Sequence, residues 1–377
     1  MDKQVYKWGR MACFVSALCF ESGKAGRDPL LAEKGKNMNM LNEAFPGGGH
    51  VVILGAGASI ASTIRNPERW NRKLPSMDDL PNVIFMNDLL YRLPDELKCD
   101  NFEQLYTNIH NWNPNSEILA RMNDRIFEYF KSLCLPDEPT IYDYLVMSLR
   151  PKDVIATFNW DPFLYQAWCR NYNHGANPHL CFLHGSVNVG FDEEHNILGL
   201  AGKRVSERNL YFEPSKLLYP TGNKDYENDP FIKGQWEKLR SWLSAESTWR
   251  VTIFGYSAPV SDKAAIQLMH DAWGGSEKRN MEQFEMIDIR NENEVRNSWD
   301  TFVHSHHYDY CTDFFQSSLA QHPRRTSESY FNWAYCITPE LAFHEAMPVP
   351  QDFKTMQELW DWYQPLIDVE EAKHANG

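Results

Sequence analysis

The stretch Val51-Val-Ile-Leu-Gly-Ala-Gly-Ala-Ser59 decides how the rest of the chain can fold. It opens with an apolar run, and a glycine turn and a helical pattern follow at once. Glycines at Gly55 and Gly57 let a backbone approach a pyrophosphate, and a helix beginning there offers N–H groups with partial positive charge. The stretch predicts a strand, a phosphate-binding turn and a helix. A plain strand-to-helix turn without a ligand is the alternative.

The same turn departs from the pattern of hydride-transferring enzymes. The dinucleotide-binding pattern carries a third glycine where this chain has Ile60. A dehydrogenase also needs an acidic residue at the end of a second strand, about twenty residues further on. Here Glu68, Asp78 and Asp79 lie in a charged stretch that contains proline. The sequence therefore predicts a bound nucleotide but not a hydride-transfer domain.

Further short apolar runs recur along the chain, and each ends in a polar or glycine-rich turn. Runs in which the side chains on both sides of the strand are apolar suit a parallel sheet that is buried on both faces. Helical patterns lie between them, most clearly at 262–273, where Ser261 or Asp262 is placed to cap the helix. This alternation predicts an α/β fold with a Rossmann-like, doubly wound parallel sheet. The expected strands are 50–54, 154–157, 180–183, 250–254 and 284–289.

Two long stretches interrupt this alternation. Residues from about 66 to 150 are predicted to form a mostly helical insertion, and residues 187–249 to hold loops plus a helix near 232–243. The tail after Glu340 is also expected to be helical, most strongly at 356–363. The predicted organisation is a leader at 1–40, a main domain at 41–300 and a helical, aromatic extension at 301–377.

Composition narrows the classes of partner. The net charge of −14 argues against direct nucleic-acid binding, because a basic surface supplies most of the affinity for phosphate backbones. The eight cysteines include no CxxC pair, so neither a zinc module nor a disulfide framework is predicted. Scattered single cysteines fit a reducing cytoplasm. No apolar run reaches the length of about eighteen residues that a membrane span needs. We expect a cytoplasmic protein.

Polar side chains follow two of the predicted strands. Asn159 and Asp161 come after the second strand, and His184 after the third. Ligands of open parallel sheets bind outside the carboxyl ends of the strands. Asn159 offers a donor and an acceptor for a ribose hydroxyl or a water, and His184 can act as a general base. Singly, such residues more often serve turns, helix caps or the core. Their joint occurrence with the glycine turn favours a site.

Four short motifs, taken in order, resemble those of the sirtuin superfamily. They are Gly55-Ala-Gly-Ala-Ser59, Thr157-Phe-Asn-Trp-Asp161, Leu183-His-Gly185 and Gly255-Tyr-Ser257. The resemblance covers roughly residues 50–295 and implies NAD as the bound molecule. It implies that Gly55, Ala56, Gly57 and Ser59 hold the pyrophosphate side, Asn159 and Asp161 the nicotinamide ribose, Gly255 and Ser257 the adenosine half and Asn291 the adenine ribose, with His184 as the base.

The resemblance breaks where protein-deacylating sirtuins hold their peptide. They carry Gly-Ile-Pro-Asp-Phe-Arg after the glycine turn, whereas this chain reads Ile60-Ala-Ser-Thr-Ile-Arg65. They also carry a four-cysteine zinc module, which has no counterpart here. These departures are similar to those of the divergent bacterial sirtuin-like domains that hydrolyse NAD in antiphage defence. The resemblance implies an NAD hydrolase in which Asn159 orients the ribose and a water, and His184 assists attack at the anomeric carbon.

Two other functions stay open. One is a deacylase or ADP-ribosyltransferase that uses the same NAD site, and the other is a non-catalytic scaffold that senses NAD or ADP-ribose. The resemblance further implies a homo-oligomer, and by analogy an ATPase partner of the HerA translocase class. The segments His304-Ser-His-His-Tyr308 and Trp360-Asp-Trp-Tyr363 are the candidates for such contacts. No metal site is predicted, because no carboxylate or cysteine supports these histidines at a suitable spacing.

Overall fold

The computed structural model describes most of the chain from residue 48 onward. The leader predicted at 1–40 and the histidines His304, His306 and His307 lie outside the described residues. The described ranges are 48–72, 74–76, 79–175, 177–195, 197–206, 209–221, 226–244, 248–258, 262–274, 284–303, 308–335 and 347–375.

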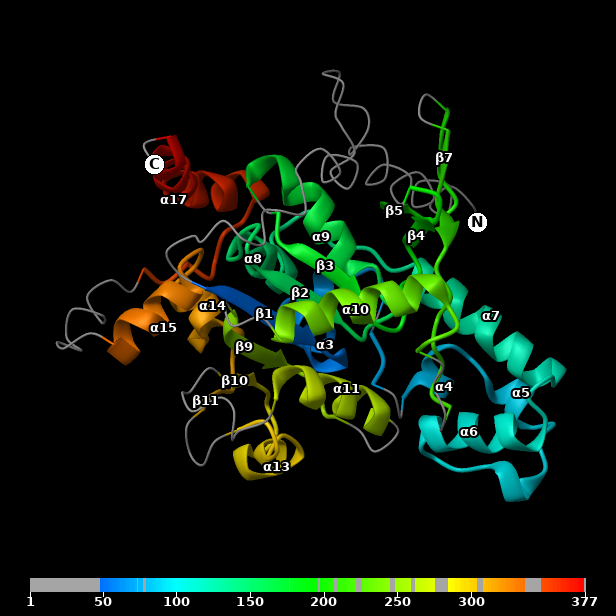
Figure 1. Cartoon of the computed structure of the whole chain (residues 1–377). Coiled ribbons are helices and arrows are strands. Elements are labelled where there is room, and N and C mark those ends of the chain that lie inside the picture. The colour runs from blue at the N-terminus through cyan, green and yellow to red at the C-terminus, as the bar shows by residue number, and fades with distance from the viewer. Residues whose placement is uncertain are drawn as a thin grey trace.

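A six-stranded parallel sheet forms the centre of the molecule, in the order β11-β10-β9-β1-β2-β3 (Figure 1). The five predicted strands are confirmed. The sixth was not predicted, because three residues that begin exposed show no periodicity. The strands are β1 (Gly49–Leu54), β2 (Val154–Thr157), β3 (His179–Phe182), β9 (Thr248–Phe254), β10 (Phe284–Ile287) and β11 (Asp309–Cys311).

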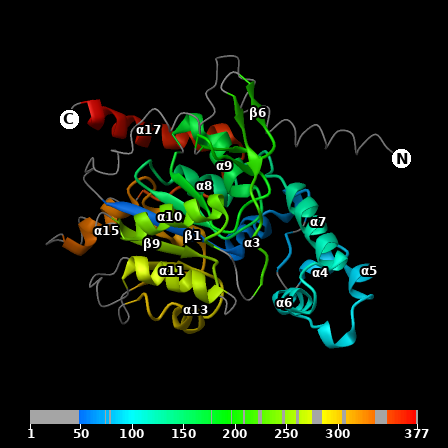
Figure 2. The same cartoon turned by 45° about the vertical axis from the view of Figure 1, so that its right-hand side comes forward.

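Helices cover both faces of this sheet. A Cβ added to Gly49 would lie 3.1 Å from the Trp242 ring, which belongs to α10 (Pro230–Ser244). The next side chain along β1, His50, faces the other way, and its Nδ1 lies 2.8 Å from the hydroxyl of Thr326. Thr326 begins α15 (Thr326–Tyr335). Because successive side chains of a strand point to opposite faces, α10 and α15 lie on opposite sides. The predicted doubly wound architecture is confirmed (Figure 2).

A buried polar chain ties the strands together on the α15 face. His50 Nε2 lies 2.7 Å from Thr252 Oγ1, which in turn donates to Glu285 at 2.8 Å. The hydroxyl proton of Thr252 goes to the carboxylate, so Thr252 accepts from the Nε2–H of His50. Burial, together with the charges of Arg250 and Lys152, holds the pKa of His50 well below its usual range. This polar chain explains why an otherwise apolar strand carries a histidine.

The order of the strands reverses between β1 and β9. From β1 the sheet continues through β2 and β3 in one direction, and from β9 through β10 and β11 in the other. Ligands of doubly wound sheets bind at such a reversal, in the crevice outside the carboxyl ends of the strands. The turns after β1, β2, β3 and β9 all open at this edge.

The predicted helical insertion is confirmed, and Figures 1 and 2 both show α4 to α7 as a lobe beside the sheet. Asn101 caps α6 by accepting from Gln104 N, and Ser116 caps α7 by accepting from Leu119 N. After β1 and α3 (Ala56–Ile64) come η3 (Pro67–Arg69), α4 (Leu80–Val83), α5 (Asn87–Leu90), η4 (Asp95–Leu97), α6 (Phe102–Trp112), α7 (Glu117–Lys131) and α8 (Ile141–Met147).

The stretch 187–249 differs from its prediction in one respect. The helix is present as α10, but the expected loops contain short antiparallel strands, two to four residues long, in which no alternation can show. A three-stranded sheet has the order β5-β4-β8, and β6 pairs with β7. Between β2 and α10 lie α9 (Phe163–Asn171), η5 (Tyr172–His174), β4 (Val189–Asp192), β5 (Ile197–Leu200), β6 (Arg204–Val205), β7 (Leu210–Tyr211) and β8 (Glu213–Pro214).

The C-terminal part packs on the main domain. Its tail forms the predicted helix, α17 (Met356–Ala375). Tyr363 is buried with its hydroxyl 2.9 Å from Ser148 Oγ, and Trp360 Nε1 donates to Asn171 at 2.7 Å. Tyr363 therefore packs within this chain, whereas Trp360 is only partly buried. The prediction that the segment 360–363 contacts other chains stays a prediction. The remaining elements are α11 (Lys263–Trp273), α13 (Glu292–Ser298), η8 (Phe314–Gln316) and α14 (Ser318–Gln321). No described helix is both long and apolar enough to cross a membrane.

Candidate active site

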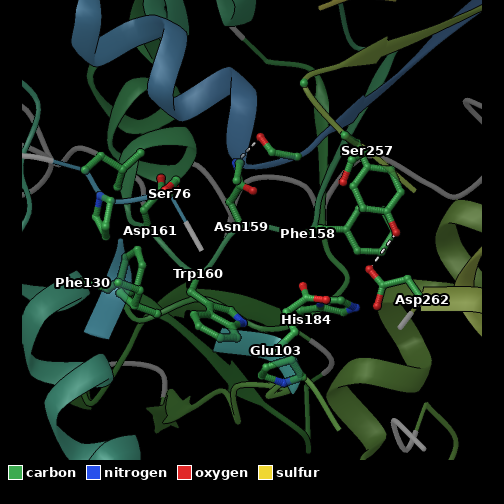
Figure 3. A pocket seen from close by; sticks show the side chains of 18 of the residues that line it. Ser76, Glu103, Phe130, Phe158, Asn159, Trp160, Asp161, His184, Ser257 and Asp262 are labelled. Carbon is green, nitrogen blue, oxygen red and sulfur yellow. Dashed lines mark hydrogen bonds between the residues drawn. The ribbon is translucent and has the colours of Figure 1, made fainter. Parts of the chain in front are cut away.

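A cavity of about 860 Å³, measured with its open mouth, lies where the strand order reverses. The structure brings together seven of the ten predicted site residues in its wall, and Figure 3 shows several of them converging. They are Gly55, Ala56, Asn159, Asp161, His184, Gly255 and Ser257.

The glycines are required because two turns pack against each other. Gly255, after β9, has a φ of +60°, and a Cβ on it would lie 2.4 Å from Ala58 N. The Gly57 N–H donates to Gly255 O at 2.9 Å. This N–H is therefore satisfied by the protein, and the role that the resemblance implies for Gly57 at the pyrophosphate stays a prediction. Ala56, at the first turn of α3, is the exposed residue of this turn and lines the cavity.

Hydrogen bonds fix the side chain of Asn159 in one orientation. Its Nδ2 donates to Gly55 O at 2.8 Å and to Ser59 Oγ at 3.0 Å. Both amide hydrogens are then used, and no described residue bonds to Oδ1. Asn159 therefore presents a carbonyl oxygen to the cavity that it lines, which suits a ribose hydroxyl or a water.

Ser59 lies behind the cavity wall rather than in it. It is fully buried, and its hydroxyl donates to Asp161 Oδ2 at 2.7 Å. The other oxygen of Asp161 accepts from Phe163 N at 3.1 Å. Burial raises the pKa of Asp161 to about 6, against the opposing effect of these hydrogen bonds. Ser59 thus connects Asn159 to Asp161 behind the wall, and the role that the resemblance implies for it at the pyrophosphate stays a prediction.

His184 is held among aromatic rings at the end of β3. Its Nε2 lies 3.3 Å from the hydroxyl of Tyr226, and its ring meets Phe158 edge-on at 4.8 Å. Phe158 in turn stacks on Tyr256 at 4.1 Å between ring centroids. Leu218 N donates to His184 O and fixes the backbone there. His184 is thereby oriented within the cavity wall that it shares with Asn159.

The charge of the cavity wall is negative. Glu103, Asp161 and Asp262 all line it, and the described lining residues include no lysine or arginine. Asp262 is the N-cap residue of α11 but makes no side-chain cap bond, and it accepts from Tyr256 OH at 2.8 Å instead. Ser261, the other residue predicted to cap this helix, lies outside the described residues. Such an acidic wall favours a ligand that carries or develops positive charge, and leaves Ala56, at the first turn of α3, as the part of the wall that could meet an anion.

The insertion supplies a second wall that sequence reasoning missed. Trp160 also lines the cavity; it follows β2 next to Asn159 and is not part of the insertion. Its buried indole N–H has no partner among the described residues. Glu103, from α6, lines the same cavity and is labelled in Figure 3. No motif marks the insertion residues, because they reach the cavity only through the tertiary fold. They are Leu74, Pro75, Ser76, Leu80, Glu103 and Phe130.

Asn291 does not belong to this cavity. It is exposed and caps α13, accepting from Asn293 N at 3.0 Å. The structure therefore does not bring it to the other predicted residues, because β10 ends at Ile287 and the chain turns into a helix. No group of three His, Cys, Asp or Glu side chains in the described part of the chain is placed to hold a metal ion.

No family model matches the chain, and no curated protein sequence matches it. The solved structures that match include sirtuins. A sirtuin structure concerned with substrate affinity is 15% identical, covers 74% of this chain and 92% of its own, and has a TM-score of 0.35. A Sir2 homologue in complex with NAD is 12% identical, with coverage of 74% and 90% and a TM-score of 0.31. Likenesses of this size give no information on a shared activity.

Proposed function

We propose that the chain is an NAD⁺ hydrolase that releases nicotinamide and ADP-ribose. The observation that carries this proposal is the fixed amide of Asn159. Its oxygen is directed into a cavity that His184 also lines, at the reversal of the strand order. An oriented acceptor and a base in one cavity suit attack by water on a ribose carbon. The four motifs that resemble sirtuins support NAD as the substrate.

The chemistry needs little beyond these groups. The bond between C1′ and the nicotinamide nitrogen breaks, and its electron pair neutralises the cationic ring. Water forms the new C1′–O bond and gives a proton to His184. Asn159 Oδ1 accepts from the ribose hydroxyl or from the attacking water. The positive charge that moves from the ring to the ribose is stabilised by the acidic wall around Asp161.

The experiment that tests this proposal is nicotinamide release from NAD⁺ by the purified chain. We expect His184→Ala and Asn159→Ala to lower kcat at least about a hundredfold, with unchanged circular dichroism. His195→Ala is the matched control, because His195 bonds to Asp192 next to the β4–β5 turn, away from the cavity. A His184→Ala variant that retains the wild-type rate would sink the assignment.

From the resemblance alone, we also propose that the activity depletes NAD in antiphage defence and that assembly controls it. Further copies of this chain, or an ATPase of the HerA class, are the proposed partners. Co-purification with such an ATPase, followed by the nicotinamide assay, tests this. A rate that the ATPase leaves unchanged, with no complex on gel filtration, contradicts it.

A further inference from the structure

Tyr142 lies behind the candidate active site and belongs to none of the four motifs. It comes from α8, at the end of the inserted segment, and is 1% exposed. Its hydroxyl lies 2.5 Å from Ser59 Oγ and 3.4 Å from Asn159 Nδ2. Its ring packs edge-on against Phe163, with centroids 6.0 Å apart. The phenol hydroxyl is therefore the part of Tyr142 that reaches toward the site.

The direction of each hydrogen bond in this group follows from counting protons. Ser59 has one hydroxyl proton and donates it to Asp161. The short contact to Tyr142 is then made by the phenol proton, so Tyr142 donates to Ser59. Ser59 Oγ accepts this bond and a second one from Asn159, which fills both of its lone pairs.

The same count fixes which end of the Asn159 amide faces the cavity. Rotating the amide by half a turn would place Oδ1 against Gly55 O and Ser59 Oγ. Neither has a proton to give it, because a carbonyl cannot donate and the Ser59 proton is used on Asp161. The orientation of Asn159 therefore depends on the proton of Ser59 staying where it is. Tyr142 holds it there by donating to the same oxygen.

We propose that Tyr142 is a positioning residue for the hydrolysis of NAD⁺. Its hydroxyl holds Ser59, and Ser59 holds the Asn159 amide with its oxygen toward the substrate. The inference rests on the proposed function, since it assigns Tyr142 a part in that same reaction. It also assigns the inserted segment a positioning role in addition to forming a wall of the cavity.

The test compares Tyr142→Phe with Tyr144→Phe. The first variant removes the hydroxyl and keeps the ring. The second does the same two residues further along α8, where Tyr144 is also buried but packs against Phe315 and Phe353. We expect Tyr142→Phe to lower kcat about tenfold to a hundredfold, with KM for NAD⁺ and Kd for ADP-ribose within about twofold. Tyr144→Phe should keep the wild-type kcat.

A double variant separates positioning from a merely structural role. If Tyr142 acts through Ser59, then Ser59→Ala together with Tyr142→Phe should lower kcat little more than Ser59→Ala alone. An unchanged kcat in Tyr142→Phe, with an active wild type, overturns the inference and leaves the proposed function standing. Equal losses in Tyr142→Phe and Tyr144→Phe, with matching losses of thermal stability, also overturn it. A wild type that binds ADP-ribose but never releases nicotinamide overturns both.

Discussion

Asn159 illustrates how much of the proposed chemistry depends on one side chain. A primary amide has two ends of nearly equal shape, and only its partners decide which end meets a ligand. Here Gly55 O and Ser59 Oγ both accept from Nδ2. The carbonyl oxygen remains for the cavity. An asparagine held in this way acts as a fixed acceptor, with little reorganisation when the substrate binds.

The buried carboxyl of Asp161 gives a pH-dependent prediction. Its pKa is raised from 3.8 to about 6, so the folded state holds the proton more tightly than the unfolded state. The free energy of unfolding of the wild type should therefore fall, relative to that of Asp161→Asn, as the pH rises from 4 to 6. The relative change should reach about 3 kcal/mol, because each pKa unit corresponds to about 1.4 kcal/mol. Denaturant unfolding at several pH values measures it. A difference between the two proteins that stays constant from pH 4 to pH 7 would contradict the burial of an ionisable group at this position.

At the scale of residues, the sequence predicts the site only where a motif spans neighbouring positions. Asn159, Asp161 and His184 each follow a strand directly, so their placement at the edge of the sheet follows from topology. Tyr142 contacts Ser59 across 83 positions, and no local pattern encodes such a contact. Asn291 lies outside the cavity. It follows a strand in the right order, yet its side chain caps a helix instead of reaching the cavity.

At the scale of elements, the two glycine turns after β1 and β9 form one unit. Each turn occupies the space that a side chain on the other would need, as at Gly255 and Ala58. The glycine pattern predicts a turn that approaches a phosphate, and the structure also uses these glycines for packing the two turns together. Both uses place glycine at the same positions, so the sequence alone could not separate them.

This packing predicts the effect of adding one methyl group. Gly255→Ala combines a strained φ of +60° with a contact of 2.4 Å to backbone. Gly202 has a φ of +75° with nothing within 4 Å of an added Cβ, so Gly202→Ala carries the strain without the contact. We expect Gly202→Ala to cost about 1–2 kcal/mol of unfolding free energy. Gly255→Ala should cost at least about 1 kcal/mol more, and also weaken ADP-ribose binding.

Urea unfolding and calorimetric titration with ADP-ribose measure the two effects. Equal losses of unfolding free energy in Gly255→Ala and Gly202→Ala would contradict the close packing of the two glycine turns. A Gly255→Ala variant that binds ADP-ribose as the wild type does would remove the β9 turn from the binding site.

Element lengths decide which parts of the fold the sequence could predict. The strands buried on both faces, such as β1 and β9, show as apolar runs. The long helices show through their apolar spacing, as in α7 and α17. Strands of two to four residues, such as those of the sheet β5-β4-β8, are shorter than any period that could show them. Their positions depend on pairing partners that the sequence does not name.

At the scale of the whole molecule, charge and topology favour the same interpretation. The chain carries a net charge of −14, and the cavity wall repeats this sign with Glu103, Asp161 and Asp262. An acidic cavity at a reversal of strand order disfavours a polyanion and suits a cationic ring with a compact pyrophosphate at a helix N-terminus. NAD⁺ has this distribution of charge. Its oxidised ring is positive, while its reduced ring is neutral.

The measurement that tests the central claim most directly is product analysis after incubation of the chain with NAD⁺ in ¹⁸O-labelled water. We predict nicotinamide and ADP-ribose in equal amounts, with one ¹⁸O atom at the anomeric position of ADP-ribose and no products from Asn159→Ala. Nicotinamide without labelled free ADP-ribose would show that water is not the acceptor, as in a deacylase or an ADP-ribosyltransferase. NAD⁺ that binds and stays intact would instead identify a sensing scaffold and contradict the proposed hydrolysis.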